Sequence, residues 1–162
     1  AVIPDEFKPS DYNRDALAKE RSRLAEVQAM TEEECAVKAA AQYEETKKRY
    51  ETAIQDGLDL LAKYRSMLKQ VNEWQAPSEE HKGLKAFMRE QITSSIAHDC
   101  SGTYYQDQLT KLKLLSGEDW RAEQIEAANN GIDYHTKGHA EEVERVNKRT
   151  EWVQKLKASL QP

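Results

Sequence analysis

A long stripe of evenly spaced side chains constrains the fold of this chain more than any other feature. Between residues 36 and 71 the spacing alternates between four and three residues, through Ala36, Ala40, Tyr43, Lys47, Tyr50, Ile54, Gly57, Leu61, Tyr64, Leu68 and Val71. A heptad pattern of this kind is typical of a helix that packs along a partner helix, here over about 50 Å at a rise of about 1.5 Å per residue. The stripe therefore predicts one long helix in a coiled-coil bundle.

Capping residues place the first two predicted helices. Ser10 is expected to cap a helix that ends near Ala29, because a serine side chain accepts hydrogen bonds from the backbone N–H groups of a first turn. The run Thr31–Glu34 has the Thr-x-x-Glu pattern of a capping box and predicts a second helix from about Glu32 to about Trp74. Between them we expect a bend or a short break near residue 30.

Breaking residues place the remaining helices. Pro77 is the only proline within the helical region, and it ends the second helix because the residue before a proline is driven out of the α conformation. Ser78 begins a third helix, which we expect to continue to about Leu115. A turn at Ser116–Gly117 then begins a fourth helical stretch, which we expect to be interrupted at Asn129–Gly131.

These segments define a fold class. Hydrophobic residues make up 38% of the 162 residues and charged residues 33%, a balance that suits a thin, elongated bundle. No strand-like alternation occurs. The sequence therefore predicts an all-α fold: an elongated antiparallel three-helix bundle with a shorter N-terminal helix. It forms a single domain over residues 1–162, with an irregular leader at residues 1–9 and turns near 76–78 and 116–118.

Charge and chain ends bear on partners and location. The net charge is −5, with Lys and Arg interleaved among Asp and Glu, so no basic face and no nucleic-acid partner are expected. No apolar run approaches the roughly 20 residues of a transmembrane segment. The chain begins at Ala1, as a protein cleaved from a secretory signal would, and an excised boundary explains this start equally well. Export is slightly favoured over a cytoplasmic location.

The motifs of common catalytic and cofactor sites do not occur in the sequence. There is no Gly-rich phosphate loop, no Gly-x-Ser-x-Gly, no His-Glu-x-x-His and no Cys-x-x-Cys. We therefore predict no enzyme and no cofactor. A hairpin at Pro77 would place Cys35 and Cys100 on the order of 27 Å apart, too far for a disulfide, so both thiols are expected to be free.

One polar region stands out when the predicted hairpins are folded at Pro77 and at Ser116–Gly117. Three glycines inside the long helices, Gly57, Gly102 and Gly131, then lie at similar heights. The polar and aromatic residues predicted around them form what we call the central belt: Asp56, His98, Asp99, Asp133, Tyr134, His135 and His139. These seven residues are the candidate ligand-binding residues of the sequence.

The central belt has three interpretations. His135 and His139 are four residues apart, share a helix face and could chelate a metal ion, with His98 as a third ligand. The belt could instead recognise another ligand. In the third interpretation, which we favour, His139 is a core histidine and the glycines only let helices approach one another or bend.

The favoured function is non-enzymatic binding, in which a long rigid helical surface is presented to a protein partner. Trp74 and Trp120, at the two ends of the predicted bundle, are candidate exposed anchors for such a partner. One alternative is a metal- or small-ligand-binding bundle that uses the central belt. Another is a cytoplasmic coiled-coil adaptor or assembly subunit. A homo-oligomer is compatible with each of these functions.

Overall fold

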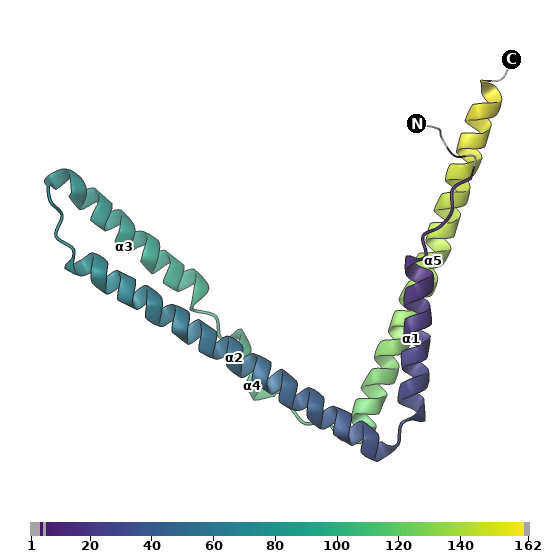
Figure 1. The fold of residues 1–162 in the computed structure, drawn as a ribbon, viewed down its shortest axis with the longest axis horizontal. Coiled ribbons are helices and arrows are strands. Elements are labelled where there is room, and N and C mark those ends of the chain that lie inside the picture. Colours follow the sequence, from purple (N-terminus) through teal and green to yellow (C-terminus); the bar gives the residue numbers. More distant parts are fainter. Residues whose placement is uncertain (1–3, 5, 161–162) are drawn as a thin grey trace. The chain divides into compact units, whose positions relative to one another are not determined.

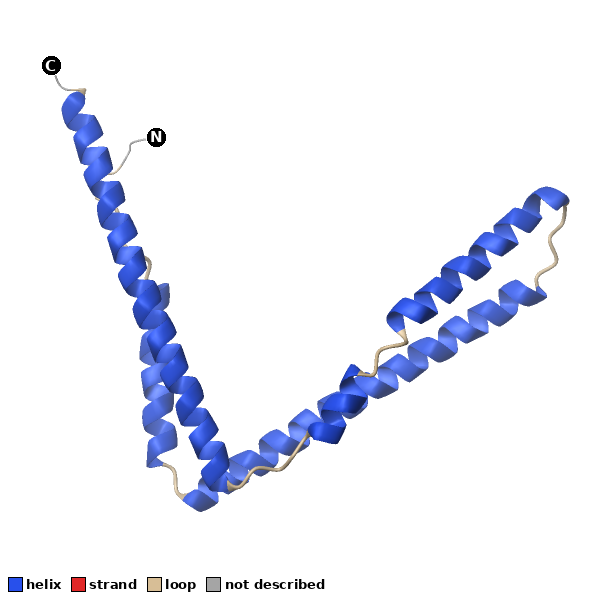
Figure 2. Cartoon of the chain, turned by 180° about the vertical axis from the view of Figure 1, so that it is seen from behind, coloured by secondary structure: helices blue, strands red, loops and turns tan. Residues whose placement is uncertain are grey.

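The computed structural model describes residue 4 and residues 6–160, and the regular structure in that range is entirely helical (Figures 1 and 2). The all-α class is therefore confirmed. The described residues divide into two compact units. Unit 1 combines the chain up to Ala39 with the chain from Leu115 onward, and unit 2 spans Ala40–Leu114. The three-helix topology and the single domain stay predictions.

Unit 1 is built on the pairing of α1 (Tyr12–Ala29) with α5 (Gly117–Ser159), which lie side by side (Figure 1). Its core contains Val27, Cys35, Ala39 and Trp120. Met30, Leu115 and Ile125 pack against these residues. Trp120 is 7% exposed, so the prediction that it anchors a partner from an exposed position is wrong: its indole ring fills the core of the unit instead.

The predicted break between the first two helices is confirmed. Met30 is extended, with ψ of 146°, and α2 (Glu32–Glu73) begins two residues later. The capping box closes as expected: the Thr31 N–H donates to Glu34 Oε2 at 2.8 Å, and the Glu34 N–H donates to Thr31 Oγ1 at 3.2 Å. Ser116 caps α5 in a similar way, because its Oγ accepts a hydrogen bond of 3.0 Å from the Asp119 N–H.

The segment before α1 is irregular, as predicted, but its described part is bound to α5. The Phe7 N–H donates to Thr150 Oγ1 at 3.0 Å, and the Arg149 guanidinium lies 4.1 Å from the centre of the Phe7 ring. Ser10 does not cap α1, whose N-cap is Asp11. Its N–H and Oγ donate to the carboxylate of Glu142 instead, at 3.0 and 3.3 Å, so that prediction is wrong.

Unit 2 is a helical hairpin. Its first arm is α2 from Ala40 onward, and α3 (Glu79–Asp99) folds back along it after the turn that contains Pro77 (Figures 1 and 2). Lys85 Nζ closes the hairpin by donating to the carbonyl oxygens of Asn72 and Trp74, at 2.8 and 2.7 Å. A lysine ammonium thus satisfies carbonyl groups at and beyond the end of α2.

The heptad stripe is the packed face of α2 from Tyr43 to Val71, where every stripe residue is half-buried. Its first two members, Ala36 and Ala40, are exposed, and the buried residues in those turns are their neighbours Cys35 and Ala39. The stripe thus predicted the inward face of α2 from Tyr43 onward, and in the turns before Tyr43 the buried positions lie one residue earlier than predicted.

Two predictions about helix continuity are wrong. The third helix is not continuous, because the chain leaves the α conformation at Cys100 and resumes it in α4 (Tyr104–Lys111). The fourth stretch is not interrupted, since α5 runs through Asn129–Gly131. A Cβ atom at Gly131 would lie 2.9 Å from side-chain carbons of Glu20, so this glycine leaves room for the Glu20 side chain of α1. The helix continues through position 131 despite the low helix propensity of glycine.

Candidate functional site

The α3–α4 break opens a cavity against α2, and this cavity is the candidate binding site of unit 2. Its volume is about 220 Å³. The apolar side is supplied by α2 and the other side by the break and the start of α4. The lining residues are Ala53, Ile54, Gly57, Leu58, Leu61, Asp99, Cys100, Gly102, Tyr104, Tyr105 and Gln106.

Two glycines line this cavity. A Cβ atom built on Gly57 or on Gly102 would have no heavy atom within 4 Å beyond its own chain neighbours and local helix backbone. Gly57 lies in the interior of α2, where a glycine costs about 1 kcal/mol relative to alanine. No neighbouring atom requires a glycine at position 57, whereas the Glu20 side chain lies close to the Cβ position of Gly131. The open space beside Gly57 is therefore part of the cavity and does not result from close packing of two helices.

Tyrosine side chains stand beside the cavity. The rings of Tyr104 and Tyr105 meet edge to face, with their centroids 5.2 Å apart. The ring centroid of Tyr105 also lies 6.0 Å from that of Tyr50 on α2. Tyr104 is 62% exposed. The Arg49 guanidinium lies 5.5 Å from the centre of the Tyr50 ring. These rings offer an apolar and polarizable surface at the mouth of the cavity.

One carboxylate of the central belt lies at the cavity. Asp99 ends α3, and its Oδ2 accepts a hydrogen bond of 2.8 Å from the hydroxyl of Tyr64 on α2. This hydrogen bond, together with desolvation and the negative charge of Asp99, raises the pKa of Tyr64. The pair ties the end of α3 to the packed face of α2 just before the break. Cys100, half-buried, follows directly and lines the cavity.

The structure assigns the central belt to different units. Asp56, His98 and Asp99 belong to unit 2, and of these only Asp99 lines the cavity. The other four residues belong to unit 1, on α5: Asp133, Tyr134, His135 and His139. Asp56, His98, Asp133 and Tyr134 are exposed.

The two belt histidines of unit 1 differ in their contacts. His135 Nδ1 lies 3.1 Å from Asn13 Oδ1 on α1, and the ring also meets Tyr12 and Tyr134 edge to face. His139 Nδ1 is buried and has no hydrogen-bond partner in the structure. His135 therefore helps to join α1 to α5. In the part of the chain that the structure describes, no three His, Cys, Asp or Glu side chains gather as a metal site would require.

A polar cluster beside His135 fastens the segment before α1 to α5. Glu142 accepts hydrogen bonds from Ser10 and, at 3.5 Å, from Asn13 Nδ2. The hydrogen bonds from the Ser10 backbone and hydroxyl lower the pKa of Glu142. A cavity of about 520 Å³ borders this cluster and is lined by Ser10, Tyr12, Asn13, Gly138, Glu141, Glu142 and Arg145. The carboxylates of Glu141 and Glu142 already have partners from the same chain. The cluster therefore holds the segment before α1 against α5.

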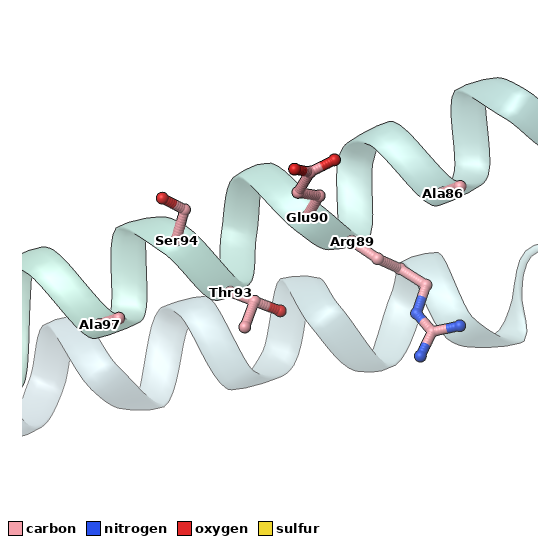
Figure 3. A pocket seen from close by; sticks show the side chains of 6 residues that line it. All are labelled: Ala86, Arg89, Glu90, Thr93, Ser94 and Ala97. Carbon is pink, nitrogen blue, oxygen red and sulfur yellow. The ribbon is translucent and has the colours of Figure 1, made fainter.

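A third hollow lies on α3 alone. It has a volume of about 500 Å³ and is lined by Ala86, Arg89, Glu90, Thr93, Ser94 and Ala97 (Figure 3). The two alanines leave space between longer side chains of the same helix, so the hollow is an open surface depression. A single helix face of this kind does not enclose a small ligand.

The sequence missed the tyrosines around the cavity as site residues. The pair Tyr104–Tyr105 follows Ser101–Gly102, a short run of weak helix formers, and this combination is the signal that could have placed an aromatic pair at a helix start. Tyr50 was interpreted as a packed core residue of the stripe in preference to a member of an aromatic ligand groove. No protein-family model, no curated protein and no solved structure matches the chain.

Proposed function

We propose that this chain is a non-enzymatic binding protein whose α2–α3 hairpin receives a helical segment of a protein partner. The partner inserts one side chain into the cavity beside Gly57. The cavity carries the proposal, because it lies against the apolar side chains of α2 and has open space at the Cβ position of Gly57. A heptad stripe is typical of a helix that packs along partner helices, and a third helix along the hairpin would cover more of its apolar surface.

The thin core of unit 2 supports this proposal. Of the residues between Ala40 and Leu114, all of which the structure describes, Ile92 is the only buried hydrophobic one. Leu58 is 53% exposed at the cavity, although it is a large apolar residue. Two helices alone cannot bury both apolar stripes, and exposed apolar patches on soluble proteins often mark interaction sites.

The size of the cavity favours a side chain over a free small molecule. Small-molecule sites usually enclose about 300 to 1,000 Å³, more than the volume found here. A single anchor residue in a small apolar pocket, surrounded by aromatic side chains, is a common arrangement in protein interfaces. A metal-binding function has no comparable support, because the described residues contain no cluster of three metal-ligating side chains.

Photo-crosslinking tests the proposal. A photoreactive phenylalanine derivative replaces Leu58, and in a control chain it replaces Ser66, an exposed α2 residue that does not line the cavity. In extracts of the native source, the probe at position 58 should crosslink to one defined polypeptide, and the probe at 66 should not. Peptide mapping should place the crosslink on a helical segment of that polypeptide.

Filling the cavity provides the matched comparison. Gly57→Leu should abolish the crosslink because the leucine side chain occupies the space of the partner's anchor. Gly83→Ala should leave the crosslink unchanged: it also replaces a helical glycine with no heavy atom near its Cβ position, but it lies outside the cavity. Circular dichroism checks that both variants fold. An equal crosslink in the Gly57→Leu chain would exclude the cavity as the anchor site.

A further inference from the structure

The last four turns of α5 carry a basic charge that the rest of the chain does not. Five basic residues and one acidic residue, Glu151, occur between Arg145 and Leu160, so this segment has a net charge of +4. The whole chain has a net charge of −5. Opposite charges remain interleaved up to Glu151, since Arg145 pairs with Glu142 and Lys148 pairs with Glu144. Between Trp152 and Leu160 there are two lysines and no acidic residue, so the interleaving that led us to expect no basic face ends there.

The same segment exposes a strip of large apolar side chains. Trp152 is 65% exposed, Leu156 is 38% exposed and Leu160 is 75% exposed. They follow one another at intervals of four residues and therefore share one side of the helix. Val153, beside them, is buried. The strip is thus an unburied continuation of an apolar surface that is covered elsewhere in unit 1.

Lysines stand on both sides of this strip. At 3.6 residues per turn, Lys155 lies on one side of the line from Trp152 to Leu160, and Lys157 lies on the other. Lys148 lies on the same side as Lys155, but its ammonium pairs with Glu144. Lysine stems can lie along an apolar surface while their ammonium groups reach outward to anionic headgroups. An apolar face with a tryptophan and flanking lysines is typical of a helix that lies in the interface of an anionic membrane.

We infer that the end of α5 binds the surface of membranes that contain anionic lipids. None of the described helices combines the length and apolarity that a membrane crossing requires. The strip would instead enter the headgroup region with the helix parallel to the surface. A stable protein interface buries at least about 1,200 Å² in total, which is more than three side chains along a short stretch of helix supply. Membrane affinity can add the attraction of several charges to a small apolar area.

Vesicle sedimentation tests this inference on the full chain. The chain should sediment with vesicles in which phosphatidylserine replaces about a third of the phosphatidylcholine, and should remain in solution with phosphatidylcholine alone. Replacing Trp152 and Leu156 together by serine should abolish sedimentation. Tyr134→Ser is the matched control, because Tyr134 is also highly exposed on α5 but lies outside the segment.

The charge contribution has its own control. Lys155→Gln should lower the partition coefficient about fivefold, the effect expected for one basic charge near an anionic surface. Lys137→Gln, on the same helix but outside the segment, should leave it unchanged. Equal sedimentation with neutral and anionic vesicles, or equal loss in the Trp152 and Tyr134 variants, would overturn the inference. So would retention on immobilised polyglutamate without any sedimentation with vesicles, which would assign this face to an acidic protein.

Discussion

Gly117 and Gly83 show how differently two helical glycines can act in the same chain. A Cβ atom at Gly117 would lie 2.4 Å from the carbonyl oxygen of Glu32 and 2.9 Å from the backbone nitrogen of Ala36. These are backbone atoms, which cannot rotate away. At Gly83 there is no heavy atom within 4 Å beyond its local surroundings. The contact geometry, rather than the helix position, decides what alanine would do at each site.

We therefore expect opposite effects from two Gly→Ala substitutions. Gly117→Ala should lower the free energy of unfolding by about 1 to 3 kcal/mol, because α2 and α5 must separate. Gly83→Ala should raise it by about 1 kcal/mol through the higher helix propensity of alanine. Denaturant unfolding of the two variants beside the parent chain measures both changes. A parent-like midpoint for Gly117→Ala would mean that α5 does not begin against α2.

The bond between Tyr64 and Asp99 can be followed through the titration of the phenol. Its hydrogen bond to Asp99 raises the pKa of Tyr64 above 10.0 in the folded chain. A raised pKa means that the folded state favours the neutral phenol. The resulting stabilisation is complete below the unfolded pKa and is lost as the pH rises through the folded pKa.

We expect one tyrosine to ionise at higher pH than an exposed tyrosine would, as measured by the ultraviolet absorbance of tyrosinate. Tyr64→Phe should remove that step, and Asp99→Ala should move it back toward pH 10.0. His98→Ala, next to Asp99 but exposed, is the control and should leave the step in place. If the Asp99→Ala and parent titrations coincide, Asp99 does not hold the phenol.

At the scale of elements, the capping box is the clearest link from sequence to structure. Thr31 and Glu34 exchange two hydrogen bonds at the start of α2, next to the core that contains Cys35 and Trp120. We expect Thr31→Ala to lower the free energy of unfolding by about 1 kcal/mol, since one backbone N–H loses its partner. Ser66→Ala, on an exposed position inside the same helix, should not destabilise the chain.

Chemical denaturation monitored by circular dichroism measures both changes. If Thr31→Ala unfolds at the same denaturant concentration as Ser66→Ala, the capping box does not contribute to stability. The start of α2 would then be held by packing around Cys35 and Trp120 alone.

Local signals and long-range contacts explain which elements were predictable. The start of α2 and the turn at Pro77 depend on residues adjacent in sequence, and both were predicted correctly. Gly131 lies against the side chain of Glu20 on another helix, and Ser10 is bonded to Glu142 rather than to its own helix. No spacing rule within one segment reveals such partners.

The candidate site was predictable only in part, for the same reason. The place of Asp99 near Gly57 was recognisable from the sequence, but the break at Gly102 was not, because the third helix was expected to continue to about Leu115. The aromatic wall of the cavity, however, requires knowing that α3 ends at Asp99 and that a new helix begins at Tyr104. That break rotates Tyr104 and Tyr105 out of the register that a continuous helix would give them, which is why they were not assigned to the site.

At the scale of the whole molecule, buried apolar side chains are unequally divided. Unit 1 contains Val27, Cys35, Ala39, Trp120, Ala128 and Val153, whereas unit 2 contains only Ile92. Regions with few buried contacts open at lower free energy than regions with a packed core. The proposed function needs this difference, because a hairpin that already had a full core would gain little from a partner helix.

Amide hydrogen exchange of the isolated chain, followed residue by residue, tests this central claim most directly. After correction for intrinsic rates, the amides of α3 should exchange much faster than those of α1 and of α5 between residues 120 and 150. Gly57→Leu should slow exchange in α3, because the new side chain fills the cavity and adds core to unit 2. Equal protection of α3 and α1 in the isolated chain, with no change in the Gly57→Leu variant, would contradict the view that the hairpin is completed by a partner.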